Sequence, residues 1–116
     1  MQLSDRLQAV TTVLELSESF ETAKAKLRAF PWNYEGPEVI MTRGHVANLL
    51  RRFLDGEIGA GTVVDWADLL EMREDLDFEE EDRDWLTNVL SELSNPYTNG
   101  ELTRERAMEL LVEAEA

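Results

Sequence analysis

The sequence predicts an all-α protein, with one domain over residues 1–116 that forms a compact bundle of five to six short helices. Apolar residues recur at spacings of three and four along most of the chain, as on the buried face of an amphipathic helix. Each patterned segment ends at a glycine, a proline or a short polar stretch. Helices of this length are unstable alone, so they must pack against one another.

Two helical patterns occupy the first 30 residues. The first, over residues 3–16, places apolar residues at a 4-3-4 spacing: Leu3, Leu7, Val10 and Leu14. The second runs from Phe20 to Phe30, and Ser17 or Ser19 is positioned to cap it. Since no strong helix breaker separates the two patterns, a single long helix is the alternative to two short ones.

Residues 31–37, PWNYEGP, are the clearest loop in the chain. Two prolines and a glycine interrupt regular structure, and two large aromatic residues predict a rigid, partly buried connector. The apolar run 39–41 that follows could pair as a strand or pack beneath the loop, but it is shorter than a typical strand and we favour extended coil there.

The stretch 42–66 predicts a helix, a glycine-rich corner and the start of a second helix. Thr42 is positioned to cap the first helix, which extends to about Leu54. Its apolar stripe consists of Val46, Leu49, Leu50, Phe53 and Leu54. Asp55 and Gly56 then end the helix.

Two further glycines, Gly59 and Gly61, provide the backbone freedom of the corner. Thr62 is expected to cap the next helix, with Asp65 three residues later as in a capping box. That helix fades near Arg73.

An acidic run follows at residues 74–84, EDLDFEEEDRD, with eight acids and one base. Asp77 followed by Glu80 resembles a helix cap with an acid at the third position. The helix dipole favours further acids in the first turn, so we expect a helix to begin within this run.

Two more helices complete the bundle. The apolar stripe from Trp85 to Leu93 forms one of them, and it must stop at residues 94–96 because a proline excludes helical geometry just before it. Residues 97–100 are a predicted turn, and Thr103 is positioned to cap the last helix.

Charge is the strongest compositional feature. The net charge is −14, from 25 acidic and 11 basic residues. Residues 1–58 hold 8 acids and 7 bases, a net of −1, whereas residues 59–116 hold 17 acids and 4 bases, a net of −13. Such a field repels nucleic acid and anionic membranes, and it attracts basic proteins. The alternative is that the charge serves solubility alone.

Several features that the sequence lacks limit where the protein can act and which cofactors it can hold. The chain has no cysteine, so it can form neither a disulfide nor a cysteine-ligated zinc site. It has no apolar run of membrane-spanning length and no signal-peptide pattern at its start. We therefore expect a cytoplasmic protein without a cofactor or metal.

Catalytic chemistry has little support in the sequence. His45 is the only histidine, and its place in the first turn of a helix favours a surface or capping role over general base catalysis. Without a cysteine, a Ser or Thr nucleophile would depend on this one histidine or on a lysine. We expect a protein that is not an enzyme.

Two candidate binding motifs lack residues that their function requires. A calcium loop starting at Asp75 would carry Glu80 where glycine is required and Leu86 where a bidentate acid is required. A DNA-binding helix-turn-helix at residues 42–72 would place acids on its recognition helix, namely Asp65, Asp68 and Glu71.

The acids around the run at 74–84 remain as the candidate partner-binding residues, because concentrated charge speeds encounter with a basic protein. They are Glu71, Glu74, Asp75, Asp77, Glu79, Glu80, Glu81, Asp82 and Asp84. Trp32 and Tyr34 in the loop are candidate anchors, since aromatic residues are enriched in interfaces. An inhibitor of a basic nuclease would use such a surface.

Several short motifs carry a family resemblance over residues 28–112. They are Phe30-Pro31-Trp32, Thr42, Arg52-Phe53-Leu54-Asp55-Gly56-Glu57, Asp65-Trp66-Ala67 and Leu93-Ser94-Asn95-Pro96. The set resembles a group of small acidic bacterial proteins, some similar to immunity proteins encoded beside polymorphic toxins, including contact-dependent inhibition systems. The resemblance implies a toxin-neutralising role. It assigns no binding residue, because these motifs cap helices, form corners and fill the core.

The leading hypothesis is therefore a non-enzymatic acidic binding protein, an immunity protein that neutralises a basic, nuclease-type bacterial toxin. The alternative is a self-associating helical protein with a structural or regulatory role.

Overall fold

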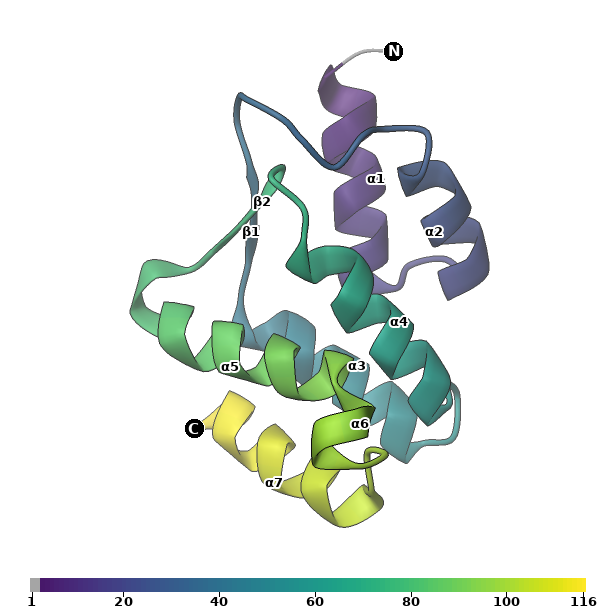
Figure 1. The fold of residues 1–116 in the computed structure, drawn as a ribbon, viewed down its shortest axis with the longest axis vertical. Coiled ribbons are helices and arrows are strands. Elements are labelled where there is room, and N and C mark those ends of the chain that lie inside the picture. Colours follow the sequence, from purple (N-terminus) through teal and green to yellow (C-terminus); the bar gives the residue numbers. More distant parts are fainter. Residues whose placement is uncertain (1–2) are drawn as a thin grey trace.

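The computed structural model describes residues 3–116, which form seven α-helices, one 3-10 turn and two short strands (Figure 1). The helices are α1 (Leu3–Glu15), α2 (Phe20–Leu27), α3 (Arg43–Leu54), α4 (Ala60–Glu71), α5 (Arg83–Ser94), α6 (Pro96–Asn99) and α7 (Arg104–Glu115). The strands are β1 (Val39–Met41) and β2 (Leu76–Phe78), and the 3-10 turn is η1 (Glu80–Asp82). The fold is mostly helical as predicted, but the expected five to six helices were too few and a small sheet was not foreseen.

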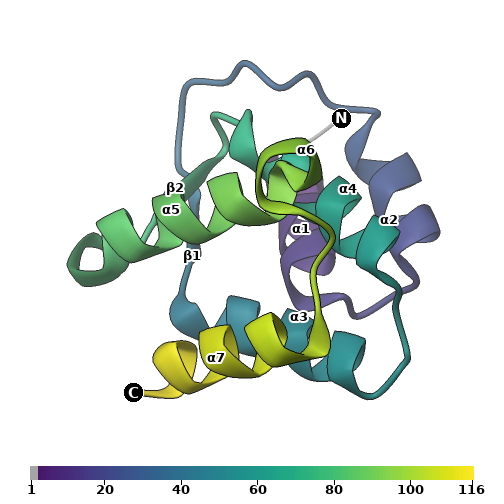
Figure 2. The same ribbon diagram turned by 60° about the horizontal axis from the view of Figure 1, so that its bottom comes forward.

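Three helix pairs make up most of the fold: α1 packs with α2, α3 with α7, and α4 with α5 (Figures 1 and 2). The core contains Leu14, Leu50, Trp66 and Leu90, all buried. The Trp66 indole N–H donates to the carbonyl oxygen of Val13 in the last turn of α1 (2.9 Å), which also accepts a longer bond from the Leu16 N–H (3.3 Å). This bond fixes α4 against α1.

The first two patterns form two helices, not one. Leu16 adopts a left-handed backbone (φ 52°) that ends α1, and its side chain is buried. The Ser19 hydroxyl then accepts a hydrogen bond from the Thr22 backbone N–H (3.3 Å) and caps α2.

The expectation of extended coil at residues 39–41 was wrong, because these residues form β1. The strand pairs in parallel with β2, with Val39 opposite Leu76 and Met41 opposite Phe78. The partner strand lies far along the chain, inside the acidic run, so no local sequence pattern predicts the pairing.

The glycine-rich corner is only partly as predicted. Gly56 has a left-handed backbone (φ 77°) directly after α3, as expected for a helix end. However, α4 begins after Gly59, and Thr62 lies inside its first turn instead of capping it. Gly61 is helical, so Gly56 provides the left-handed residue of the corner.

The acidic run also departs from its prediction, because Asp77 lies on β2 and does not cap a helix. Residues 80–82 form η1, and α5 begins only at Arg83. After α5 stops as predicted, Pro96 starts the short helix α6 where a turn was expected. The Thr103 hydroxyl caps α7 by accepting from the Arg106 N–H (3.1 Å), as predicted. None of the helices in residues 3–116 is long and apolar enough to cross a membrane.

Candidate protein-binding surface

Most of the predicted acidic residues lie on the surface. Six of the nine are exposed, namely Glu71, Glu74, Glu79, Glu80, Glu81 and Asp84. They come from the end of α4, the connection from α4 to β2, and the segment from β2 into α5. The chain therefore presents acids from successive connections around the small sheet.

Part of this charge is neutralised within the protein. Arg83 pairs with Asp77 (2.9 Å) and with Glu80 (3.0 Å), and the hydrogen bond from Arg83 lowers the pKa of the Asp77 carboxyl. Asp82 is half-buried and pairs with Arg43 (2.7 Å).

Five of the nine acids form no ion pair within the described range 3–116, and two of these, Glu71 and Glu74, accept hydrogen bonds from Ser94 and from the Tyr34 N–H. The carboxylates of the other three, Glu79, Glu81 and Asp84, have neither an ion pair nor a side-chain hydrogen bond there, and we call them the uncompensated acids. Their carboxylates remain exposed and available to a partner. They lie close together in sequence around η1, at the entrance to α5. This segment concentrates the available negative charge.

Asp75 does not belong to the surface, because it is fully buried. Its carboxylate accepts hydrogen bonds from Arg6 (3.0 Å) and from two nitrogens of Arg73 (both 2.8 Å). A buried carboxylate needs such pairing to offset its lost hydration. Asp75 therefore cannot contact a partner directly, contrary to its place among the predicted binding residues.

The two arginines that pair with Asp75 also hold the loop before β1. Arg6 and Arg73 both donate to the Pro31 carbonyl oxygen (3.1 and 3.0 Å). The Arg6 guanidinium lies 4.5 Å from the centre of the Tyr34 ring, a cation–π contact. The loop is thus attached to α1 and to the end of α4 from its inner side.

The two loop aromatics have different environments. Tyr34 is half-buried, and its hydroxyl is enclosed without a hydrogen-bond partner in the described residues. It lies against Gly36 (φ 147°), where an added Cβ would come within 2.6 Å of the hydroxyl oxygen. Trp32 instead has 57% of its surface exposed. Of the pair, Trp32 is the accessible side chain.

Met72 is an exposed residue that sequence reasoning missed. It follows α4 directly and is 67% exposed. Two residues later, the Glu74 N–H donates to the Trp32 carbonyl oxygen (3.0 Å), so this connection runs beside the loop. An apolar residue between Glu71 and Arg73 was the only signal in the sequence.

His45 acts as a cap. Its Nδ1 accepts a hydrogen bond from the Thr42 backbone N–H (2.9 Å) at the start of α3. Burial lowers the pKa of the imidazole, and the charge of Glu15 opposes that shift. The ring nitrogen that a general base would use is already engaged with the backbone.

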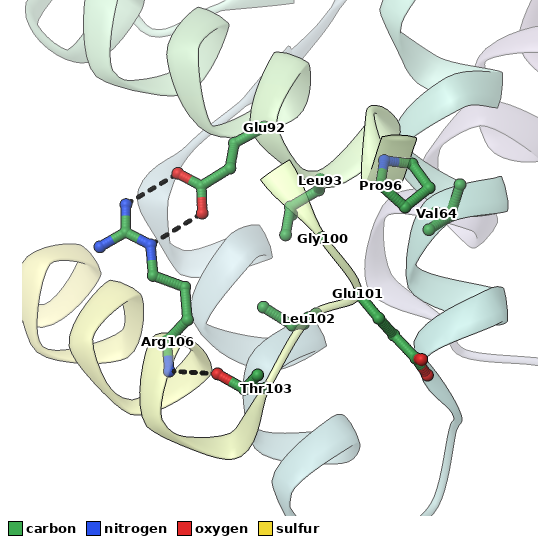
Figure 3. A pocket seen from close by; sticks show the side chains of 9 residues that line it. All are labelled: Val64, Glu92, Leu93, Pro96, Gly100, Glu101, Leu102, Thr103 and Arg106. Carbon is green, nitrogen blue, oxygen red and sulfur yellow. Dashed lines mark hydrogen bonds and ion pairs between the residues drawn. The ribbon is translucent and has the colours of Figure 1, made fainter. Parts of the chain in front are cut away.

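A pocket of about 380 Å³ lies where α5, α6 and the start of α7 meet (Figure 3). Val64, Leu93 and Leu102 form its apolar part. Glu92 and Arg106 border it as a bidentate ion pair (2.7 Å for both bonds), which lowers the pKa of the Glu92 carboxyl. Glu92 and Arg106 therefore satisfy each other, and Glu101 is the remaining charged residue of the lining.

Among the described residues, no group of three or more His, Asp or Glu side chains is arranged to hold a metal ion. Comparison of the chain with protein-family models, with curated proteins and with solved structures finds no match. The resemblance to immunity proteins thus stays an expectation from the sequence motifs.

Proposed function

We propose that this protein is a non-enzymatic binding protein for a basic protein partner, and that it acts as the immunity protein of a nuclease-type bacterial toxin. The observation that carries the proposal is the set of exposed, uncompensated acids Glu79, Glu81 and Asp84 around η1. A nuclease needs a positive surface to hold nucleic acid phosphates, and that surface is the natural counterpart of these acids.

The charge of the molecule supports the same partner class. A net charge of −13 over residues 59–116 accelerates encounter with a basic protein and disfavours nucleic acid and anionic membranes. Carboxylates already paired with Arg83 or Arg43 contribute less, because their charge is partly cancelled. The residues around η1 should therefore dominate the association rate.

The direct test is to purify the products of the two reading frames that adjoin this gene and to measure binding by calorimetry. A toxin domain among them should bind and lose its activity. If neither product binds, the proposal is wrong.

Charge reversal tests the location of the surface. The double variant Glu79→Lys/Glu81→Lys should slow association with the bound product by about tenfold or more at low salt. The control Glu21→Lys/Glu105→Lys changes the net charge equally at two other exposed sites without ion pairs in the described chain. Stopped-flow measurements at low and high salt compare them, and equal slowing by both variants would contradict a localised surface.

Self-association is the second candidate function, favoured by one observation. Met108 and Val112 are both more than half exposed and lie one turn apart on the outer side of α7. Sedimentation velocity decides between the two functions. A salt-insensitive dimer that Val112→Lys dissociates would support self-association, and a monomer at all concentrations would exclude it.

A further inference from the structure

We infer that Trp32 and Met72 are the apolar anchor of the partner interface, and that the partner is a basic protein with an apolar slot that receives Trp32. This inference rests on the proposed function and deepens it by naming the binding residues. In Figure 1 the loop between α2 and β1 crosses the upper end of α1, and the connection from α4 to β2 rises toward it. The two exposed side chains belong to these two segments.

The main chain beneath Trp32 is held from the inside. The Pro31 carbonyl oxygen accepts from two arginines, and the Trp32 carbonyl oxygen accepts from the Glu74 N–H (3.0 Å). The Tyr34 N–H donates to the Glu74 carboxylate (3.1 Å). Because these backbone groups form hydrogen bonds toward the rest of the protein, the exposed indole is carried by a preorganised loop. Preorganisation reduces the conformational entropy lost on binding.

The charge around the anchor selects the partner. Between Glu71 and Asp82 the only base is Arg73, and its side chain is 5% exposed because it is committed to Asp75. Every charge that this stretch presents to solvent is therefore negative. Exposed tryptophan is uncommon on a free surface and enriched at the energetic centre of interfaces. An exposed indole and an exposed thioether on segments joined to this acidic stretch fit an apolar slot bordered by Lys and Arg.

Asp75 is a positioning residue for this anchor. It does not reach the surface, but its carboxylate holds both arginines that hydrogen-bond to the Pro31 carbonyl oxygen. Replacing it should loosen the loop without removing any contact residue.

The experiment measures binding of the adjoining-frame product by surface plasmon resonance. Trp32→Ala should weaken binding at least tenfold, mainly through faster dissociation, and Met72→Ala should weaken it severalfold. The matched controls Tyr97→Ala and Val112→Ala remove exposed apolar side chains elsewhere and should change the affinity less than twofold. Raising the salt concentration should leave the Trp32→Ala effect unchanged, whereas it should shrink the effect of Glu79→Lys/Glu81→Lys.

The results distinguish a failure of the anchor from a failure of the proposed function. If wild type binds and Trp32→Ala matches the controls, the anchor is wrong while the proposed function stands. If wild type binds neither product, the proposed function fails and the anchor fails with it. A second measurement uses fluorotryptophan in this protein alone, because the ¹⁹F signal of Trp32 should shift on binding while that of buried Trp66 should not. An unmoved Trp32 signal in the complex overturns the inference.

Discussion

At the scale of single residues, burial decides what an acidic side chain does. Glu79 and Glu81 are exposed and unpaired within the described chain, so their charge acts on the surroundings. Asp75 lies a few residues earlier and is fully buried between Arg6 and Arg73. Its charge acts only on the interior, where it balances two guanidinium groups.

Asp75→Asn should therefore destabilise the protein strongly. The substitution preserves shape but leaves two largely buried arginines without their counter-charge, and breaking such a group lowers the free energy of unfolding by about 3 kcal/mol or more. Urea unfolding provides the measurement. Asp84→Asn removes an exposed acid as the control and should change the free energy by no more than about 0.5 kcal/mol. Equal free energies of unfolding for the two variants would show that the buried pairing does not contribute to stability.

At the scale of elements, helix ends are determined by local hydrogen bonds, whereas the strands depend on distant partners. Thr103 and Ser19 cap their helices through their own hydroxyls. At α3 the cap uses His45, whose Nδ1 accepts the Thr42 N–H only when that nitrogen carries no proton. This makes the start of α3 sensitive to pH.

The sign of that dependence follows from the lowered pKa of His45. The unfolded chain, with an ordinary pKa of 6.5, binds a proton more readily than the folded protein does. The stability is therefore fully present above about pH 6.5 and falls as the pH drops through the folded pKa. Urea midpoints at pH 7 and pH 5 measure this loss.

His45→Gln provides the control for this titration. Glutamine at this position of a capping box can still accept the Thr42 N–H, but it does not titrate. The variant should keep most of the stability at pH 7 and lose less of it on acidification than wild type. If both proteins lose the same stability, the effect belongs to the carboxylates and not to His45.

At the scale of the whole molecule, the net charge of −14 opposes the compact state. The three helix pairs bury their apolar faces in one core around Trp66, and that burial has to exceed the repulsion between surface acids. Exposed ion pairs such as Arg83–Glu80 add little because water and salt screen them.

Salt should consequently act in opposite directions on the free protein and on its complex. Raising NaCl from about 10 to 150 mM shortens the screening length from about 30 to 8 Å and should raise the melting temperature by a few degrees. The same change should weaken binding to a basic partner. Scanning calorimetry measures the change in melting temperature, and binding measurements at the same salt concentrations measure the change in affinity. A melting temperature that falls with salt would contradict the expected relief of charge repulsion.

The parts of the fold that could be predicted are those with local causes. Thr42 and Thr103 mark helix starts, and Gly56 and Pro96 mark helix ends, because each acts through its own backbone or hydroxyl within one turn. The acidic character of the surface is likewise a property of composition. These features can be predicted without knowing which segments contact one another in the fold.

Only the tertiary structure decided what depends on segments far apart in the chain. The pairing of β1 with β2, the burial of Asp75 and the inward course of Arg6 and Arg73 all arise from such contacts. No spacing rule distinguishes Asp75 from the exposed acids beside it. The outward position of Trp32 has the same origin, because it follows from hydrogen bonds that α1 and the end of α4 make to the loop.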